Sequence, residues 1–289
     1  MTISDRLFHN LFSVENPSSK GTVIQLKVFE IFTVLYTLLN TWQWAFYTQK
    51  LSDVVLPLGL AHYLDPHFFF ENNLSIINAL ILTVFLSTAF LKKQWRWLYM
   101  VAFLLYHIQY VVRFSQGEIP HSANLTGFSL LGLGLGGIFF SKQRSYLMFA
   151  FGFLLFFAGL GYTSAAISKL IGTGLSWPSG QHLWLWMVEK KIDFLSKSGA
   201  FEFNMFQKLL FNNWYLATFT LAFGLLTEFF GFLIWFKKLR PYTTTALIAM
   251  HIGIFLSMNI FFKSFTFALI IVGYPWNRWI DKFFKPGSI

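Results

Sequence analysis

The stretch GLGYTSAAISKLIGTGLSWPSG, residues 159–180, ends a long apolar run and carries one charged side chain, Lys169. The run from Tyr146 to Ile171 is otherwise free of charge. At about 1.5 Å per residue it is long enough to cross a hydrocarbon layer of roughly 30 Å. In hydrocarbon a lysine needs a partner, access to the interface, or loss of its proton. Glycines and Pro178 then end the helix, and non-helical backbone at that depth persists only where protein or a water-filled cavity covers it. We therefore predict that Lys169 lies at the edge of a site near one membrane face.

The composition indicates a membrane protein along the whole chain. Of its 289 residues, 55% are hydrophobic, 21% are aromatic and only 12% are charged, which is unlike an ordinary soluble domain. The net charge of +10 comes from small basic groups between apolar runs. Membrane topology explains that distribution better than nucleic-acid binding does, so we predict a lipid bilayer and no nucleic acid as partner. The absence of cysteine excludes disulfides, thiolate catalysis and Cys-ligated metal sites.

Eight apolar segments predict an all-α, polytopic membrane bundle in a single domain, residues 1–289, because the chain shows neither a repeat nor a linker. The predicted spans are 28–47, 74–91, 97–114, 124–140, 146–171, 214–236, 242–262 and 265–274. The last is too short to cross fully unaided. Three further segments are amphipathic or too charged to cross, and we predict that they lie in the interface: 4–12, 183–195 and 201–211.

Loop charges predict the orientation. Basic residues collect on the cytoplasmic side of membrane proteins, and most of the 22 basic residues lie there if both termini are cytoplasmic. They are Arg6, Lys20, Lys27, Lys92, Lys93, Arg96, Lys142, Arg144, Lys237, Lys238, Arg240, Arg278, Lys282 and Lys285. We therefore predict an integral protein of a bacterial inner membrane, with residues 1–27 as a cytoplasmic tail and 181–213 on the outer side.

Four polar side chains can meet in pairs in this topology. Lys169 ends a span running outward and His121 precedes one running inward, so we expect both near the outer face, lining one pocket. Glu228 and His251 flank the turn around Leu239 at nearly equal distances, which places both near mid-membrane. A carboxylate and an imidazole at equal depth reduce each other's desolvation cost by pairing. Further candidates for lining the pocket are Tyr162, Trp177, Asn124 and Asn259.

Each of these residues also has a simpler interpretation. Lys169 could extend to the outer headgroups, as lysines at helix ends commonly do. His121 follows a proline in a turn and could be solvated. Glu228 and His251 could clamp two helices together without taking part in chemistry.

Two other motifs are weaker evidence for a functional site. His62, Asp65 and His67 lie close together, but their spacing puts no two ligands firmly on one helical face, so we predict no metal site. The glycines of residues 132–137 resemble a nucleotide-binding loop only superficially, because no strand precedes them. Close helix packing explains them better.

The strongest motifs resemble a known family. Residues 161–177, GYTSAAISKLIGTGLSW, and residues 223–272, FGLLTEFFGFLIWFKKLRPYTTTALIAMHIGIFLSMNIFFKSFTFALIIV, resemble the HTTM family. This is the transmembrane domain shared with vitamin K-dependent γ-glutamyl carboxylase. Residues 120–130, PHSANLTGFSL, look like the His-Ser segment of that carboxylase. The likeness extends from the first span to about Trp276.

The resemblance implies roles for individual residues. Lys169 matches the lysine that acts as base toward reduced vitamin K, and His121 matches a histidine near that reaction centre. Glu228 and His251 match polar positions on the family's paired late helices. The implied chemistry is a lyase reaction in which oxidation of a reduced quinone drives carboxylation of glutamate. A lysine acts as base only when neutral, and an aromatic, water-poor pocket favours that form.

Two departures from the family narrow the expectation. Ser168 precedes Lys169 where the carboxylase has a second lysine, and the sequence ends at Ile289, where the carboxylase continues into a large region that holds its protein substrate. We therefore expect a small, lipidic or partner-presented substrate.

Three functions remain open at this point. The first is a quinol-linked, lysine-base membrane enzyme. The second is a non-catalytic binding or assembly subunit that keeps the scaffold. The third is a small-molecule or lipid transporter, although the chain lacks the paired broken helices that such proteins favour.

Overall fold

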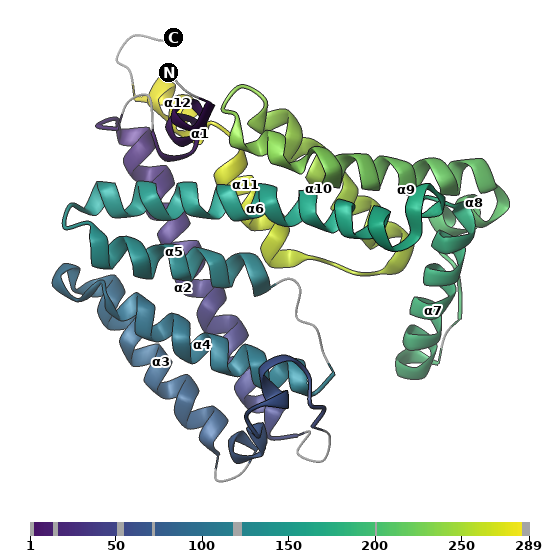
Figure 1. Ribbon diagram of the computed structural model, residues 1–289, viewed down its shortest axis with the longest axis horizontal. Helices are drawn as coiled ribbons and strands as arrows, with labels where there is room; N and C mark the ends of the chain where they lie inside the picture. Colours follow the sequence, from purple (N-terminus) through teal and green to yellow (C-terminus); the bar gives the residue numbers. More distant parts are fainter. Residues whose placement is uncertain are drawn as a thin grey trace. The chain divides into compact units, whose positions relative to one another are not determined.

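The computed structural model describes residues 3–13, 17–50, 55–70, 73–117, 123–199 and 201–284, and these residues form helices and no strand (Figure 1). Within them, six helical segments are long and apolar enough to cross a membrane. They are α2 (Lys20–Thr48), α3 (Leu74–Leu91), α4 (Leu98–Ser115), α6 (Gln143–Thr173) with η5 (Gly174–Ser176), α9 (Trp214–Phe229) with η6 (Phe230–Trp235), and α10 (Arg240–Met258). The predicted all-α fold is confirmed for the described residues, and these six segments fit the predicted membrane bundle by their length and composition.

The predicted count of eight spans is not confirmed. Two of the predicted spans form shorter apolar helices, α5 (Asn124–Phe139) and α11 (Lys263–Gly273). At 1.5 Å per residue they measure about 24 Å and about 17 Å, which is less than the roughly 30 Å of a hydrocarbon layer.

The chain divides into two compact units. Unit 1 comprises residues 1–155 and 275–289, and unit 2 comprises residues 156–274. Unit 1 contains α1 (Ile3–Phe12), α2, the short helices η1 (Gly59–His62), η2 (Pro66–Phe69) and η3 (Lys93–Trp95), α3 to α5, the first part of α6, and α12 (Trp276–Phe283). Unit 2 contains the rest of α6, α7 (Gly180–Ser198), α8 (Met205–Asn212) and α9 to α11.

In unit 1, α2 begins earlier than the sequence predicts. The predicted span starts at Val28, whereas the helix starts at Lys20. Ser19 is the reason, because its hydroxyl accepts a hydrogen bond from the Thr22 N–H (3.1 Å) and so caps the first turn. Helix α2 and the apolar run that predicted it therefore have different limits, and Lys27 lies inside the helix.

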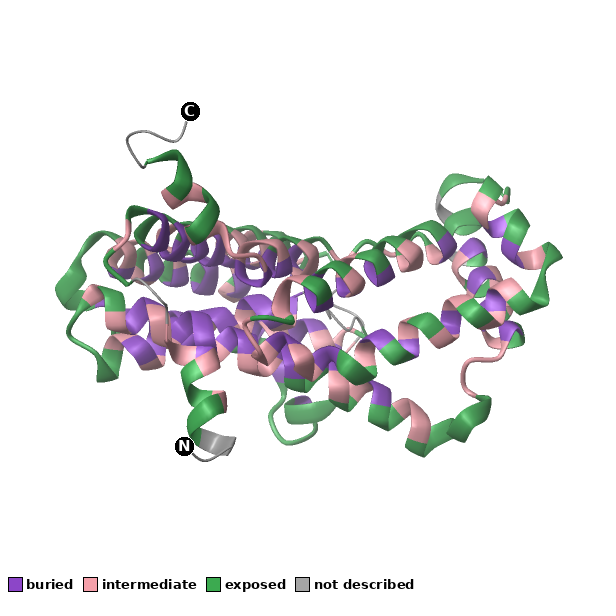
Figure 2. Ribbon diagram, turned by 90° about the horizontal axis from the view of Figure 1, so that it is seen from above, coloured by how far each residue is buried: buried purple, intermediate pink, exposed green. Residues whose placement is uncertain are grey.

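The start of α2 is covered by α12, from the other end of the chain. The Gly21 N–H donates to the Asp281 carboxylate (2.8 Å), and the Asn277 N–H donates to the Gln25 side chain (3.2 Å). A side chain at Gly21 would collide with the Asn277 carbonyl oxygen, so only glycine permits this approach. No residue of α12 is buried, as Figure 2 shows beside the C-terminus. Helix α12 thus packs on α2 and leaves its own outer face exposed.

The glycine run of α5 lets this helix pack closely on two neighbours. A Cβ at Gly134 would stand 2.8 Å from the backbone of Met100 in α4, and one at Gly137 would stand 2.7 Å from the Arg96 carbonyl oxygen. On another face, a Cβ at Gly136 would stand 2.9 Å from the Tyr146 carbonyl oxygen in α6. The prediction of close helix packing is confirmed.

We expect Gly134→Ala to destabilise the protein by roughly 1–3 kcal/mol, because the new methyl group would push against backbone that cannot rotate away. Gly127→Ala on the same helix is the matched control, since its Cβ would lie 3.7 Å from the Tyr106 ring, an ordinary contact. Reversible unfolding in mixed micelles measures both. Equal stabilities of the two variants would contradict the close packing of α5 on α4.

In unit 2, the predicted interfacial segments form the helices α7 and α8. The side chains of Asn204 and Gln207 each accept from the other's backbone N–H (2.8 and 3.0 Å), a capping box that starts α8. The two helices pack with α9 around buried residues Leu183, Met187, Leu210, Ala217 and Leu221. Their predicted position at a membrane interface stays a prediction.

Candidate functional site

Lys169 is placed by the end of α6. The helix stops four residues later at Thr173, and Gly174 takes a left-handed conformation (φ +67°) that most side chains disfavour. Trp177 follows at the end of η5, and α7 begins at Gly180 after the capping residue Ser179. The predicted helix break in residues 172–180 is confirmed, and it turns Trp177 back toward Lys169.

Lys169 forms an ion pair with Glu228, the next-to-last residue of α9. The lysine ammonium also lies 4.8 Å from the centre of the Trp177 ring, within reach of a cation–π interaction. The exposed fractions of the two side chains are 30% for Lys169 and 12% for Glu228. The ammonium thus has an anion and an aromatic face as partners inside an apolar helical unit.

The pair borders a cavity of about 260 Å³. Helices α6, α7, α9 and α10 and the segment after η5 supply its walls. The lining residues are Lys169, Trp177, Leu183, Trp186, Thr220, Leu221, Phe223, Gly224, Glu228, Ala249, Met250, Gly253, Ile254, Ser257 and Met258. The hydroxyls of Thr220 and Ser257 donate to carbonyls of their own helices (2.8 and 2.7 Å). The ion pair is therefore the main polar feature that this cavity offers a ligand.

His251 lies beside Tyr162. The tyrosine hydroxyl and the histidine Nε2 are 2.6 Å apart, and the rings of Phe262 and Phe265 lie 5.0 and 6.0 Å from the imidazole centre. The side chain is buried, and its Nδ1 has no hydrogen-bond partner in the part of the chain that the structure describes. The Tyr162–His251 contact joins α6 to α10.

The predicted Glu228–His251 pair does not form, because Glu228 contacts Lys169 and His251 contacts Tyr162. The prediction assumed two straight antiparallel α-helices. The chain after Phe229 instead continues as the 3₁₀ segment η6, in which each residue turns by about 120° and not by 100°. Equal distance from the turn therefore does not give facing side chains. In addition, an ammonium offers a carboxylate a stronger partner than an imidazole does.

The other predicted residues are distributed as follows. Trp177 lines the cavity beside Lys169. Asn259 ends α10 in a left-handed conformation (φ 57°) and donates its N–H to the Phe255 carbonyl (2.9 Å), and it is not part of the cavity wall. Asn124 lines a different cavity, in unit 1. His121 lies outside the residues that the structure describes.

The sequence interpretation missed a carboxylate in unit 1. Glu30 of α2 is 2% exposed and accepts hydrogen bonds from the hydroxyls of Tyr99 (3.0 Å) and Tyr146. Lys27, one turn earlier, pairs with its other oxygen at 2.7 Å. A charged residue inside an apolar run was the available signal, since such a residue needs a partner.

The loop between α2 and α3 contains the His62, Asp65 and His67 group. Asp65 caps η2, and its carboxylate accepts from the His67 backbone N–H (3.0 Å) and contacts the His67 ring (2.6 Å). These bonds, the backbone one first, lower the pKa of the exposed Asp65 carboxyl. The described residues contain no group of three or more His, Asp or Glu side chains arranged to hold a metal ion.

Comparison with known proteins found no matching family model, curated protein or solved structure. The geometry of the Lys169 cavity and the motifs of the sequence are therefore the observations that bear on function.

Proposed function

We propose that this protein is a membrane enzyme of the lysine-base type. In this proposal the cavity between α6, α7, α9 and α10 binds a reduced quinone, and Lys169 accepts a proton from a hydroxyl group of the bound molecule. The observation that supports it most is an ammonium–carboxylate pair at the wall of an apolar cavity. The resemblance of residues 161–177 and 223–272 to the HTTM family points to the same lysine.

The lining residues fit a quinone-like molecule. Trp177, Trp186 and Phe223 offer aromatic faces, and Met250 and Met258 offer polarizable side chains that adapt to an irregular shape. Ligand pockets commonly combine such apolar walls with a few polar groups that set orientation. When bound, a reduced quinone would supply two electrons and the ring hydroxyl from which a proton is taken.

The ion pair gives Lys169 a way to act as base. The charged form of the pair and its neutral form differ only in whether one proton is bound to the Lys169 nitrogen or to the Glu228 carboxylate. Apolar surroundings disfavour separated charges, so they reduce the free-energy difference between the charged and the neutral form. In the neutral form Glu228 holds the proton and the Lys169 nitrogen offers its lone pair to a ligand hydroxyl. Glu228 is then a positioning and proton-holding residue.

A second function is favoured by the same contact. A lysine and a glutamate that neutralise each other also fasten α6 to α9, as a purely structural clamp would. The chain would then be a non-catalytic subunit that binds a lipid-soluble ligand or a partner protein. The two functions share the cavity and differ in what Lys169 does.

Anaerobic binding of reduced 2-methyl-1,4-naphthoquinone tests the proposal. Gly253 lines the cavity, and a Cβ there would meet nothing within 4 Å, so Gly253→Leu should fill the cavity without a clash. We expect this variant to bind at least about tenfold more weakly, which corresponds to about 1.4 kcal/mol. Gly161→Leu is the matched control, because Gly161 has equal space but does not line the cavity. Isothermal titration calorimetry in micelles measures both.

The lysine is tested separately. Lys169→Met should abolish oxygen-dependent oxidation of the reduced quinone by the full-length protein, even at saturating ligand. If the unaltered protein binds the quinone at this cavity but shows no such oxidation, the subunit function replaces the enzyme. If Gly253→Leu and Gly161→Leu bind equally well, the cavity is not the quinone site and the proposed enzyme fails.

A further inference from the structure

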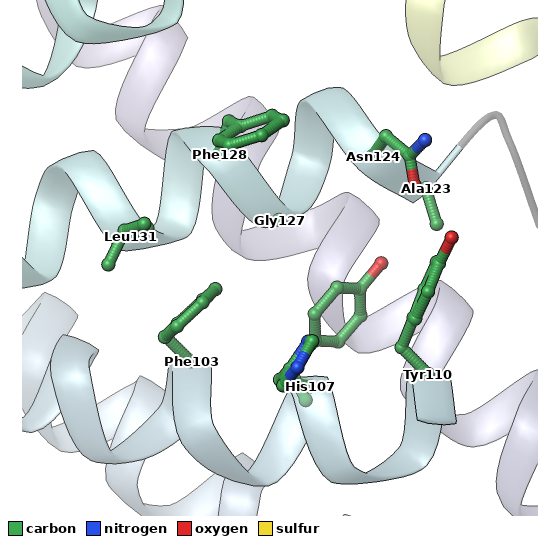
Figure 3. A pocket seen from close by; sticks show the side chains of 9 residues that line it. Phe103, His107, Tyr110, Ala123, Asn124, Gly127, Phe128 and Leu131 are labelled. Carbon is green, nitrogen blue, oxygen red and sulfur yellow. The ribbon is translucent and has the colours of Figure 1, made fainter. Parts of the chain in front are cut away.

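Unit 1 contains a second cavity, of about 300 Å³, between α4 and α5 (Figure 3). Its walls come from one face of each helix. They are formed by Phe103, Tyr106, His107, Tyr110, Ala123, Asn124, Gly127, Phe128 and Leu131. Nothing in the mechanism proposed for unit 2 uses these residues.

The α4 wall is a row of nearly parallel rings. Phe103, His107 and Tyr110 lie at spacings of four and three residues, which puts them on one helix face. The planes of Phe103 and His107 differ by 15°, and those of His107 and Tyr110 by 9°. In Figure 3 these rings project from α4 toward α5. Parallel ring faces favour offset stacking of a planar ligand.

The wall is held in place from behind by α2. The Tyr106 hydroxyl accepts a hydrogen bond from the Asn40 amide (3.0 Å), and its ring stacks on Trp44 with centres 5.1 Å apart. The rings of Tyr110 and Trp44 also meet edge to face, with centres 6.2 Å apart. A preformed wall of this kind binds a ligand without first having to be ordered.

Three polar side chains of the cavity make no hydrogen bond within the described part of the chain. Among the described residues, none donates to or accepts from the side chains of His107, Tyr110 or Asn124. His107 is in the middle of α4, a helix apolar and long enough to span a membrane. A polar group at that depth is costly unless it is paired. In Figure 3 the Tyr110 hydroxyl points toward the Asn124 end of the cavity.

Candidate occupants differ in how well they match these features. An aliphatic chain would pack on Phe128 and Leu131 but would leave the three polar side chains unpaired. Water would form hydrogen bonds with the polar side chains but would not pack against the aromatic rings. We propose that this cavity binds a lipid-soluble, planar ring compound that carries a hydroxyl or carbonyl group. The ring stacks along the α4 wall, and its polar substituent pairs with His107.

Binding of 1-naphthol, compared with naphthalene, tests this inference. The full-length protein carries Gly253→Leu throughout, which closes the Lys169 cavity and makes the result independent of the proposed enzyme. We expect 1-naphthol to bind at least about tenfold more tightly than naphthalene. His107→Leu should remove most of that preference without weakening naphthalene binding.

Filling the cavity is the second measurement. Gly127 faces the ring row, and a Cβ there makes only an ordinary contact with Tyr106 at 3.7 Å. Gly127→Leu should therefore weaken 1-naphthol binding at least about tenfold, whereas Gly161→Leu in unit 2 should not. If Gly127→Leu fails to fold, Gly127→Ala gives a smaller loss in the same direction. Unchanged binding in the Gly127 variants, or equal affinity for 1-naphthol and naphthalene, would overturn the inference.

Discussion

Lys169→Met should destabilise the protein by about 2–4 kcal/mol, and adding Glu228→Met should restore much of that loss. Breaking a buried pair leaves one charge without compensation, which costs about 3–5 kcal/mol when burial is complete. The loss of stability expected for Lys169→Met is lower because Lys169 is 30% exposed. Replacing both partners by apolar side chains removes the uncompensated charge, and such replacements are often neutral.

The measurement is a double-mutant cycle from reversible unfolding in mixed micelles. The exposed pair Lys190–Glu189 in α7 (3.0 Å) provides the control, since its members are 34% and 61% exposed. There we expect a coupling below about 1 kcal/mol. Additive losses at Lys169 and Glu228 would show that the contact contributes nothing. The catalytic proposal would then lose the group that holds its proton.

Most of the helices could be predicted from the sequence, because apolar runs in this chain are long and are separated by polar turns. The break after Lys169 was also predictable, since glycines and Pro178 oppose a helix there. Helix limits were less accurate. Capping by Ser19 extends α2 back to Lys20, and a capping box sets the start of α8. Caps depend on single polar side chains, which hydropathy does not register.

The partners of the polar side chains were harder to predict. The sequence indicates that Lys169 and Glu228 each need a partner in hydrocarbon. Which residue becomes that partner depends on the rotation of each helix about its axis. The 3₁₀ segment η6 changes that rotation after Glu228. The orientation of the chain in the membrane stays a prediction, because loop charges support it and no contact within the chain does.

Two carboxylates in apolar helices illustrate how structure separates a structural role from a functional one. Both Glu30 and Glu228 pair with a lysine. Glu30 is also fully enclosed, and two tyrosine hydroxyls donate to it. Among the described residues no tyrosine hydroxyl donates to Glu228, and this carboxylate borders a cavity. A saturated carboxylate can only hold its neighbours in place, whereas one that opens onto a cavity can exchange a proton with a ligand.

Glu30→Gln should therefore act on stability alone, and strongly. Hydrogen bonds to a charged group contribute about 1.5–3 kcal/mol each, and Glu30 accepts two from tyrosines besides its bond from Lys27. A glutamine amide presents a donor where one of these groups also donates, so at least one bond is lost and one donor stays unpaired. We expect a loss of about 2–4 kcal/mol in the same unfolding assay.

The matched variants are Tyr99→Phe and Lys27→Met. Tyr99→Phe should cost about 1.5–3 kcal/mol alone but less than about 1 kcal/mol in the Glu30→Gln protein, because the carboxylate it binds is already gone. Lys27→Met should cost less than Glu30→Gln, since the lysine side chain is 38% exposed and solvent screens its charge. Quinone binding in unit 2 should stay unchanged in all three. A Glu30→Gln protein within about 0.5 kcal/mol of the unaltered chain would mean that the two tyrosines do not depend on this carboxylate.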